Sequence, residues 1–147
     1  NGGEDPRFIA RRLVILASED VGLADPFALV LATATMQAVE SVGLPECAIN
    51  LSECVIYLSL APKSNSSYEA VSKALEIARL TTNIPVPRHL LNVEDSGYKY
   101  PHEYGGFIKQ RYLPQQISDR IYNPRNISKE GKLADIYKKL WQERFEK

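Results

Sequence analysis

The sequence predicts an all-α fold, on three observations. Apolar residues recur at helical spacing through most of the 147-residue chain. No useful stretch alternates apolar and polar residues as a half-buried strand does. Proline and glycine stand where these helical patterns start and stop. A chain of this length buries roughly 70% of the surface of its unfolded form, so we expect one helical domain over residues 1–147.

The first two predicted helices begin with the same pair of residues. Asp5-Pro6 and Asp25-Pro26 each supply a side-chain acceptor at the N-cap and a proline at the first helical position. We therefore expect one helix from Pro6 to about Ser18 and another from Pro26 to about Val42. Gly22 marks the break between them.

The second helix is apolar around most of its circumference. Between Phe27 and Val39 the only polar residues are Thr33, Thr35 and Gln37. A helix of this kind is buried on more than one side. We predict that Phe27–Val42 is either the central helix of the core or part of a subunit interface. The candidate residues for this role are Phe27, Val30, Leu31, Ala34 and Ala38.

Three more helices are expected toward the C-terminus. The third begins at Asn50 or Leu51 and ends before Pro62. The fourth runs from the polar turn at 63–67 to about Leu80, with Glu69 and Lys73 expected to pair across one turn. The last helix runs from Ser128 to Phe145. Its expected apolar face consists of Leu133, Ile136, Tyr137, Leu140 and Trp141.

A long irregular segment separates the last two helices, and residues 97–125 within it mix aromatic and basic side chains. Aromatic rings stack on unpaired bases while lysine and arginine bind phosphates, so one hypothesis is a groove for single-stranded nucleic acid. Its candidate contacts are Lys99, Tyr100, Lys109 and Arg111. The alternative, which we favour on composition, is that the tyrosines pack a long loop onto the helices.

The sequence contains no self-evident active site. It has no G-x-x-x-x-G-K-[ST] loop for phosphate. The acidic pairs Glu4-Asp5 and Glu19-Asp20 are explained by helix ends. Cys47 and Cys54 match no usual zinc spacing and are expected to be buried thiols of a reducing compartment. We predict no catalytic, cofactor-binding or metal-binding residues in this chain.

Charge and hydropathy narrow the environment. The formal net charge is zero, which argues against a strong electrostatic grip on nucleic acid. Residues 1–67 contain 4 Lys/Arg and 8 Asp/Glu, whereas residues 68–147 contain 14 and 10, so a basic face in the second half is hidden in the total. No apolar run reaches transmembrane length. The start at Asn1 suggests a processed chain or a fragment.

Several stretches, spread in order along the chain, carry a resemblance to a known family. One of them is Ala17–Pro26, which reads ASEDVGLADP. The others are Gly3–Leu13, Tyr57–Asn65, Val86–Leu90, Gly97–His102 and Tyr112–Pro114. Through them the chain resembles the C-terminal region of the RarA/MgsA family of AAA+ ATPases, which includes the Werner-helicase-interacting protein. One departure is the short stretch 91–96, where the family usually carries a longer loop with Gly and Lys.

The resemblance implies a helical oligomerisation domain that follows the AAA+ module, akin to the collar domain of clamp loaders and tetrameric. It implies a parent that is a DNA-dependent ATPase of DNA replication, recombination and repair at stalled forks. ATP and Mg²⁺ would bind upstream, and no cofactor here. The implied partners are a second copy of the chain, DNA and replication proteins such as single-strand-binding protein, with no membrane. The implied location is the cytoplasm, in association with the nucleoid.

Overall fold

The structure is a computed structural model that describes residues 2–141, and within this range it is helical and contains no β-strand. The predicted all-α class is therefore confirmed. The predicted end of the last helix lies outside the described residues. The five α-helices are α1 (Pro6–Leu16), α2 (Phe27–Val42), α3 (Cys47–Leu60), α4 (Ser66–Leu80) and α5 (Ser128–Trp141).

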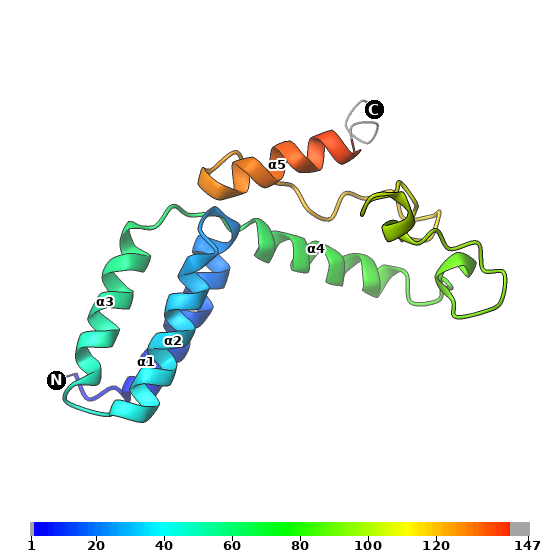
Figure 1. Cartoon of the computed structure of the whole chain (residues 1–147). Coiled ribbons are helices and arrows are strands. Elements are labelled where there is room, and N and C mark those ends of the chain that lie inside the picture. Colours follow the sequence, from blue (N-terminus) through cyan, green and yellow to red (C-terminus); the bar gives the residue numbers. More distant parts are fainter. Residues whose placement is uncertain (1, 142–147) are drawn as a thin grey trace.

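Helices α1, α2 and α3 pack side by side into a three-helix bundle (Figure 1). Small side chains fill much of its core, which lets the helices approach closely. The larger core cluster consists of Ala17, Val21, Ala28, Ala32, Cys54 and Leu58. A second cluster joins Ala10, Val39 and Cys47 near the other end of the bundle. Both cysteines are buried free thiols, as predicted.

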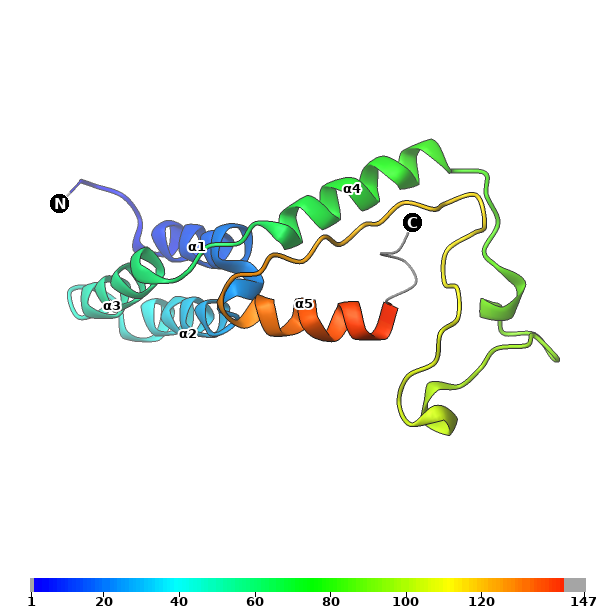
Figure 2. The ribbon, with the colours of Figure 1, turned by 90° about the horizontal axis from the view of Figure 1, so that it is seen from above.

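Helices α4 and α5 leave the same end of the bundle as two arms that point in the same general direction (Figures 1 and 2). Residues 81–127 connect the end of α4, which is far from the bundle, to the start of α5, which lies at the bundle. It passes through the short 3₁₀ turns Arg88–Leu90 and Pro101–Tyr104, then returns between α4 and α5. This layout is open, because the arms contact the bundle only near their first turns.

The helix boundaries confirm some sequence signals and correct others. The Asp5 carboxylate accepts a hydrogen bond from the backbone N–H of Arg7 at 2.9 Å, so α1 is capped as predicted. Helix α2 begins one residue later than expected, at Phe27. Helix α3 begins at Cys47 and not at Asn50, because the turn after Gly43 already leads into helix.

The break between α1 and α2 is a wide π-helical turn, Ala17–Val21, followed by the 3₁₀ turn Gly22–Ala24. These turns bring the backbone against the polar link before α4. Ser64 donates its N–H to the carbonyl oxygen of Asp20 at 2.7 Å. A Cβ on Gly22 would lie 2.6 Å from the Ser64 carbonyl oxygen, so glycine is required for this close approach.

Candidate functional site

The bundle and α5 are joined by a network centred on Asp25. This carboxylate accepts hydrogen bonds from the Tyr57 hydroxyl and from the Lys129 ammonium, the latter at 2.6 Å. Asp25 precedes α2, Tyr57 lies on α3 and Lys129 lies in the first turn of α5. The hydrogen bonds from Lys129 and Tyr57 lower the pKa of Asp25. The hydrogen bond between Tyr57 and Asp25 also raises the pKa of Tyr57. A charged carboxylate therefore holds three elements together.

A second network surrounds Glu130, the neighbour of Lys129. Its carboxylate is fully buried and accepts hydrogen bonds from the Tyr122 hydroxyl and the Arg125 backbone N–H, both at 3.1 Å. Burial acts to raise the pKa of Glu130. The hydroxyls of Ser64 and Ser66, the Arg125 N–H and Tyr122 outweigh burial and lower it. Burial and Glu130 together raise the pKa of Tyr122 to about 12.

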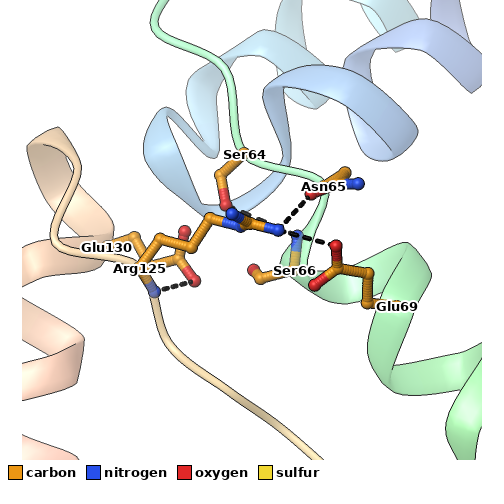
Figure 3. Close-up of polar contacts among 6 residues, drawn as sticks. All are labelled: Ser64, Asn65, Ser66, Glu69, Arg125 and Glu130. Atoms are coloured by element: carbon orange, nitrogen blue, oxygen red, sulfur yellow. Dashed lines mark hydrogen bonds and ion pairs between the residues drawn. The ribbon is translucent and has the colours of Figure 1, made fainter.

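Arg125 extends this second network to α4 (Figure 3). Its guanidinium donates to the Asn65 side chain at 2.8 Å and forms an ion pair with Glu69 at 2.6 Å. The expected pairing of Glu69 with Lys73 is therefore wrong, because Arg125 reaches Glu69 from a distant part of the chain. Lys73 instead pairs with Glu76 and Asp119. We call the two networks together the polar joint. Its members are Asp25, Tyr57, Ser64, Asn65, Ser66, Glu69, Tyr122, Arg125, Lys129 and Glu130.

Two of the stretches that carry the resemblance supply residues of the polar joint. Ala17–Pro26 provides the π-helical turn and Asp25, and Tyr57–Asn65 provides Tyr57 and the serine link. They meet at the end of the bundle, where the arms begin. Most of its charged groups pair with one another. Among the described residues, Ser66 Oγ, Arg125 Nε and Glu130 Oε2 are buried without a hydrogen-bond partner. The polar joint positions α4 and α5.

Beside the polar joint, an open apolar groove runs between α2 and α3. It has a volume of about 1020 Å³. We call it the α2–α3 groove. The described residues that line it are Asp25, Phe27, Leu31, Ala48, Ile49, Ser52, Glu53, Ile56, Tyr57, Leu60, Ala61 and Pro62. Phe27 and Tyr57 pack edge to face at the end of the groove next to the polar joint, with ring centroids 5.7 Å apart. Most of the lining is hydrophobic and exposed.

Most of the candidate residues on α2 face this groove or solvent, although Leu31 also packs against the larger core cluster. The buried positions of α2 are Ala28, Ala32, Thr35 and Val39. In contrast, Phe27 is 50% exposed and Val30 is 60% exposed. Ala34 is exposed, and Leu31 and Ala38 are half-buried. The predicted role as a core helix applies to the face of α2 that carries Ala28, Ala32, Thr35 and Val39. The role of subunit contact stays a prediction for the five candidates.

The aromatic-basic segment, residues 97–125, is organised by two polar side chains. Gln110 bridges to the backbone N–H and carbonyl of Lys99, at 3.2 and 2.7 Å, and to the Tyr112 hydroxyl. Arg111 donates to the carbonyl oxygens of Leu113, Pro114, Gln115 and Ile117 at 2.6 to 3.0 Å. These hydrogen bonds order the part up to Ile117 from within. Farther along, Asp119, Tyr122 and Arg125 join the segment to α4 and α5.

The four candidate nucleic-acid contacts differ in whether their side chains are exposed or already bonded within the chain. Tyr100 is exposed and packs against the ring of His102, with centroids 5.0 Å apart. Lys99 and Lys109 are exposed. The Arg111 guanidinium donates its hydrogen bonds to carbonyl oxygens of the following turn, and these bonds order that turn. Gln110 binds both the Lys99 backbone and the Tyr112 hydroxyl, so it brings Lys99 close to Tyr112.

Sequence reasoning missed the residues of the polar joint that come from α5. The sequence does contain a signal for the burial of Glu130, because Glu130 shares a helix face with Ala134 and Tyr137. A charged side chain on an inward face needs partners. Lys129 has no such signal, since its partner Asp25 is 104 residues away in the sequence.

A family model described as "MgsA AAA+ ATPase C terminal" matches residues 1–141. The chain belongs to this family. It is the C-terminal part of such an ATPase and not the ATPase module. The resemblance to the C-terminal region of this family is confirmed.

Curated relatives support the same assignment. Replication-associated recombination protein A of Bacillus subtilis is 40% identical over 92% of this chain and 35% of its own length. The protein of the same name from Escherichia coli is 37% identical over 90% of the chain and 32% of its length. ATPase WRNIP1 of Dictyostelium discoideum is 40% identical over 82% of the chain and 15% of its length. The chain thus spans about a third or less of these relatives.

Among the described residues, none of the helices is both long and apolar enough to cross a membrane.

Proposed function

We propose that this chain is the self-assembly domain of a replication-associated AAA+ ATPase. The observation that carries the proposal is the amount of surface left in contact with solvent. The chain exposes 10446 Å². A compact monomer of 16.5 kDa exposes about 7,500 Å². The excess of about 2,900 Å² exceeds the roughly 800 Å² that one partner buries in a standard interface.

The chemical character of this surface supports the same proposal. Exposed large apolar side chains lie on every one of the five helices, including Val30 on α2, Ile56 on α3 and Leu75 on α4. Contiguous apolar patches on soluble proteins mark interaction sites. The polar joint supports it too, because it fixes how the two arms project from the bundle. Fixed arms present these surfaces in a constant geometry to a neighbouring copy.

We infer further that the assembled domain sets the arrangement of upstream ATPase modules, which would bind ATP and Mg²⁺. The names of the relatives support a parent that acts in replication and recombination. Stalled forks, DNA and single-strand-binding protein are the proposed setting and partners, with a nucleoid-associated location in the cytoplasm. A tetramer is the proposed assembly.

The experiment that tests self-assembly is light scattering coupled to size exclusion on the 147-residue chain, supported by sedimentation over a wide concentration range. We expect a mass several times 16.5 kDa that falls on dilution. A monomer at every concentration would remove the proposal.

A second candidate function is binding of single-stranded nucleic acid by the aromatic-basic segment. The observation that favours it is the exposure of four of its tyrosines, Tyr98, Tyr100, Tyr104 and Tyr112, beside exposed lysines. Titration of a labelled oligonucleotide at several salt concentrations tests it. The proposal requires an affinity that falls with salt and that is lowered by Tyr100→Ala.

A further inference from the structure

The α2–α3 groove is apolar on its walls and acidic at its edge. Ile49 and Ile56 of α3 face Leu31 of α2 across it. Its charged lining residues are the carboxylates Asp25 and Glu53, and among the described residues that line it there is no basic side chain. Asp25 is already paired with Lys129, so Glu53 is the carboxylate that faces solvent. The groove therefore suits an apolar ridge with basic flanks.

Helix α5 carries such a ridge on the side that faces away from the polar joint. The inner side of α5 buries Glu130, Gly131 and Ala134. On the outer side Leu133 is 41% exposed and Ile136 is 53% exposed. The sequence pattern predicts these two as part of the face that packs on the domain, and the structure leaves them uncovered. Lys132 and Lys139 are exposed beside them. We call Leu133, Ile136 and half-buried Leu140 the outer ridge of α5.

The dimensions of the groove and of the outer ridge are compatible. From Ile49 to Leu60 the groove follows α3 for about 16 Å, and from Leu133 to Leu140 the ridge extends about 10 Å. A ridge of side chains that enters the groove between two helices is the usual way in which helices pack. The lysines of the ridge would then meet Glu53 at the edge of the groove.

The outer ridge cannot reach the groove of its own chain. Lys129, at the start of α5, is bound to Asp25 at one end of the groove. From there α5 points away from α2 and α3 (Figures 1 and 2). A ridge that enters this groove must come from another molecule.

We propose that the α2–α3 groove of one copy binds the outer ridge of α5 of a second copy. This inference rests on the proposed self-assembly and names the two faces that form the contact. The excess exposed area supports a second copy as the occupant, because it covers more than a standard interface requires. The charge pattern supports α5 as the element. Helix α4, whose stripe of Tyr68, Val71 and Leu75 is also exposed, is the competing occupant.

Complementation between two damaged surfaces tests the contact. Ile56→Asp places a charge in the groove and leaves the ridge intact, whereas Ile136→Asp damages the ridge and leaves the groove intact. A double variant carries both changes. Val86→Asp, at an exposed apolar residue of the irregular segment, is the matched control. Circular dichroism checks that each variant keeps its helix content. Tagged Ile56→Asp and tagged Ile136→Asp are immobilised in turn, and each is titrated with itself and with the other variants. Leu75→Asp on α4 is included among the titrants.

We expect Ile56→Asp and Ile136→Asp to bind each other at least about 100-fold more tightly than either binds itself. Neither should bind the double variant, and Val86→Asp should assemble as the unchanged chain does. If the unchanged chain assembles and either single variant assembles equally well, the groove–ridge contact is wrong while self-assembly stands. It is also wrong if Leu75→Asp, in place of Ile136→Asp, is the variant that Ile56→Asp complements. A monomeric unchanged chain would remove both proposals.

Discussion

Lys129 and Asp25 are 104 residues apart in sequence, yet the Lys129 ammonium lies 2.6 Å from Oδ1 of Asp25. Asp25 belongs to the turn between α1 and α2, and Lys129 belongs to the first turn of α5. This ion pair therefore ties the last helix to the bundle. The hydrogen bonds from Lys129 and Tyr57 keep the pKa of Asp25 below its ordinary value, so the carboxylate is charged at neutral pH.

Replacing Lys129 should loosen α5. In Lys129→Met the mostly buried Asp25 carboxylate keeps only Tyr57 as a side-chain donor, and we expect the free energy of unfolding to fall by about 1–2 kcal/mol. Urea denaturation measures this loss. The matched control is Lys138→Met, an exposed lysine on the same helix, which should change stability by less than about 0.5 kcal/mol. Equal effects of the two substitutions would contradict a special role for Lys129.

The sequence predicts the helices much better than the way in which they meet. The helical class and the Asp5 cap follow from local pattern and local chemistry, which the chain carries within a few residues. The pairing of Asp25 with Lys129 depends on how a long irregular segment returns α5 to the bundle, and no local signal specifies that. The exposure of Leu133 and Ile136 has the same origin, since periodicity marks an apolar face but not the molecule that covers it.

Glu130 should make the stability of the domain depend on acid. Its pKa in the folded chain is below the ordinary value of 4.5 because hydrogen bonds outweigh burial. A lowered folded pKa contributes stability that is present above pH 4.5 and is lost as the pH falls through the folded pKa. We expect Glu130→Gln to cost about 2–3 kcal/mol at neutral pH, because a buried network loses its charged acceptor.

The measurement for Glu130 is urea denaturation of both chains from about pH 7 down to about pH 3. The two stabilities should converge as the pH falls, since the glutamine has no charge to lose. Glu76→Gln is a suitable control, because Glu76 is exposed and carries only a surface pair with Lys73. A constant difference between Glu130→Gln and the unchanged chain over the whole range would contradict this account of Glu130.

Two glycines separate steric contact from backbone strain. Gly22 and Gly43 both have positive φ, at 52° and 75°. A Cβ at Gly22 would lie 2.6 Å from the Ser64 carbonyl oxygen, whereas a Cβ at Gly43 would meet nothing within 4 Å. We expect Gly43→Ala to cost about 1 kcal/mol from strain alone and Gly22→Ala to cost more than about 3 kcal/mol. Thermal unfolding would show the difference, and similar losses would mean that the turn shifts to make room.

Arg111 should be required for the order of the aromatic-basic segment through the shape of its side chain. Its guanidinium bonds to four carbonyl oxygens between Leu113 and Ile117, and an ammonium cannot reproduce that fork. We expect Arg111→Lys to lower the opening free energy of the segment by about 1–3 kcal/mol. Hydrogen exchange of residues 97–117 should then quicken by about tenfold or more.

Arg88→Lys is the control for Arg111→Lys, because Arg88 is exposed in the 3₁₀ turn of the same irregular region. It should leave exchange unchanged. The pair also tests the nucleic-acid hypothesis, because Arg111→Lys keeps the charge that a phosphate would meet. If its affinity for single strands falls together with its protection from exchange, Arg111 acts by ordering the segment that displays Lys99 and Tyr100. Unchanged exchange with a lost affinity would instead make Arg111 a direct contact.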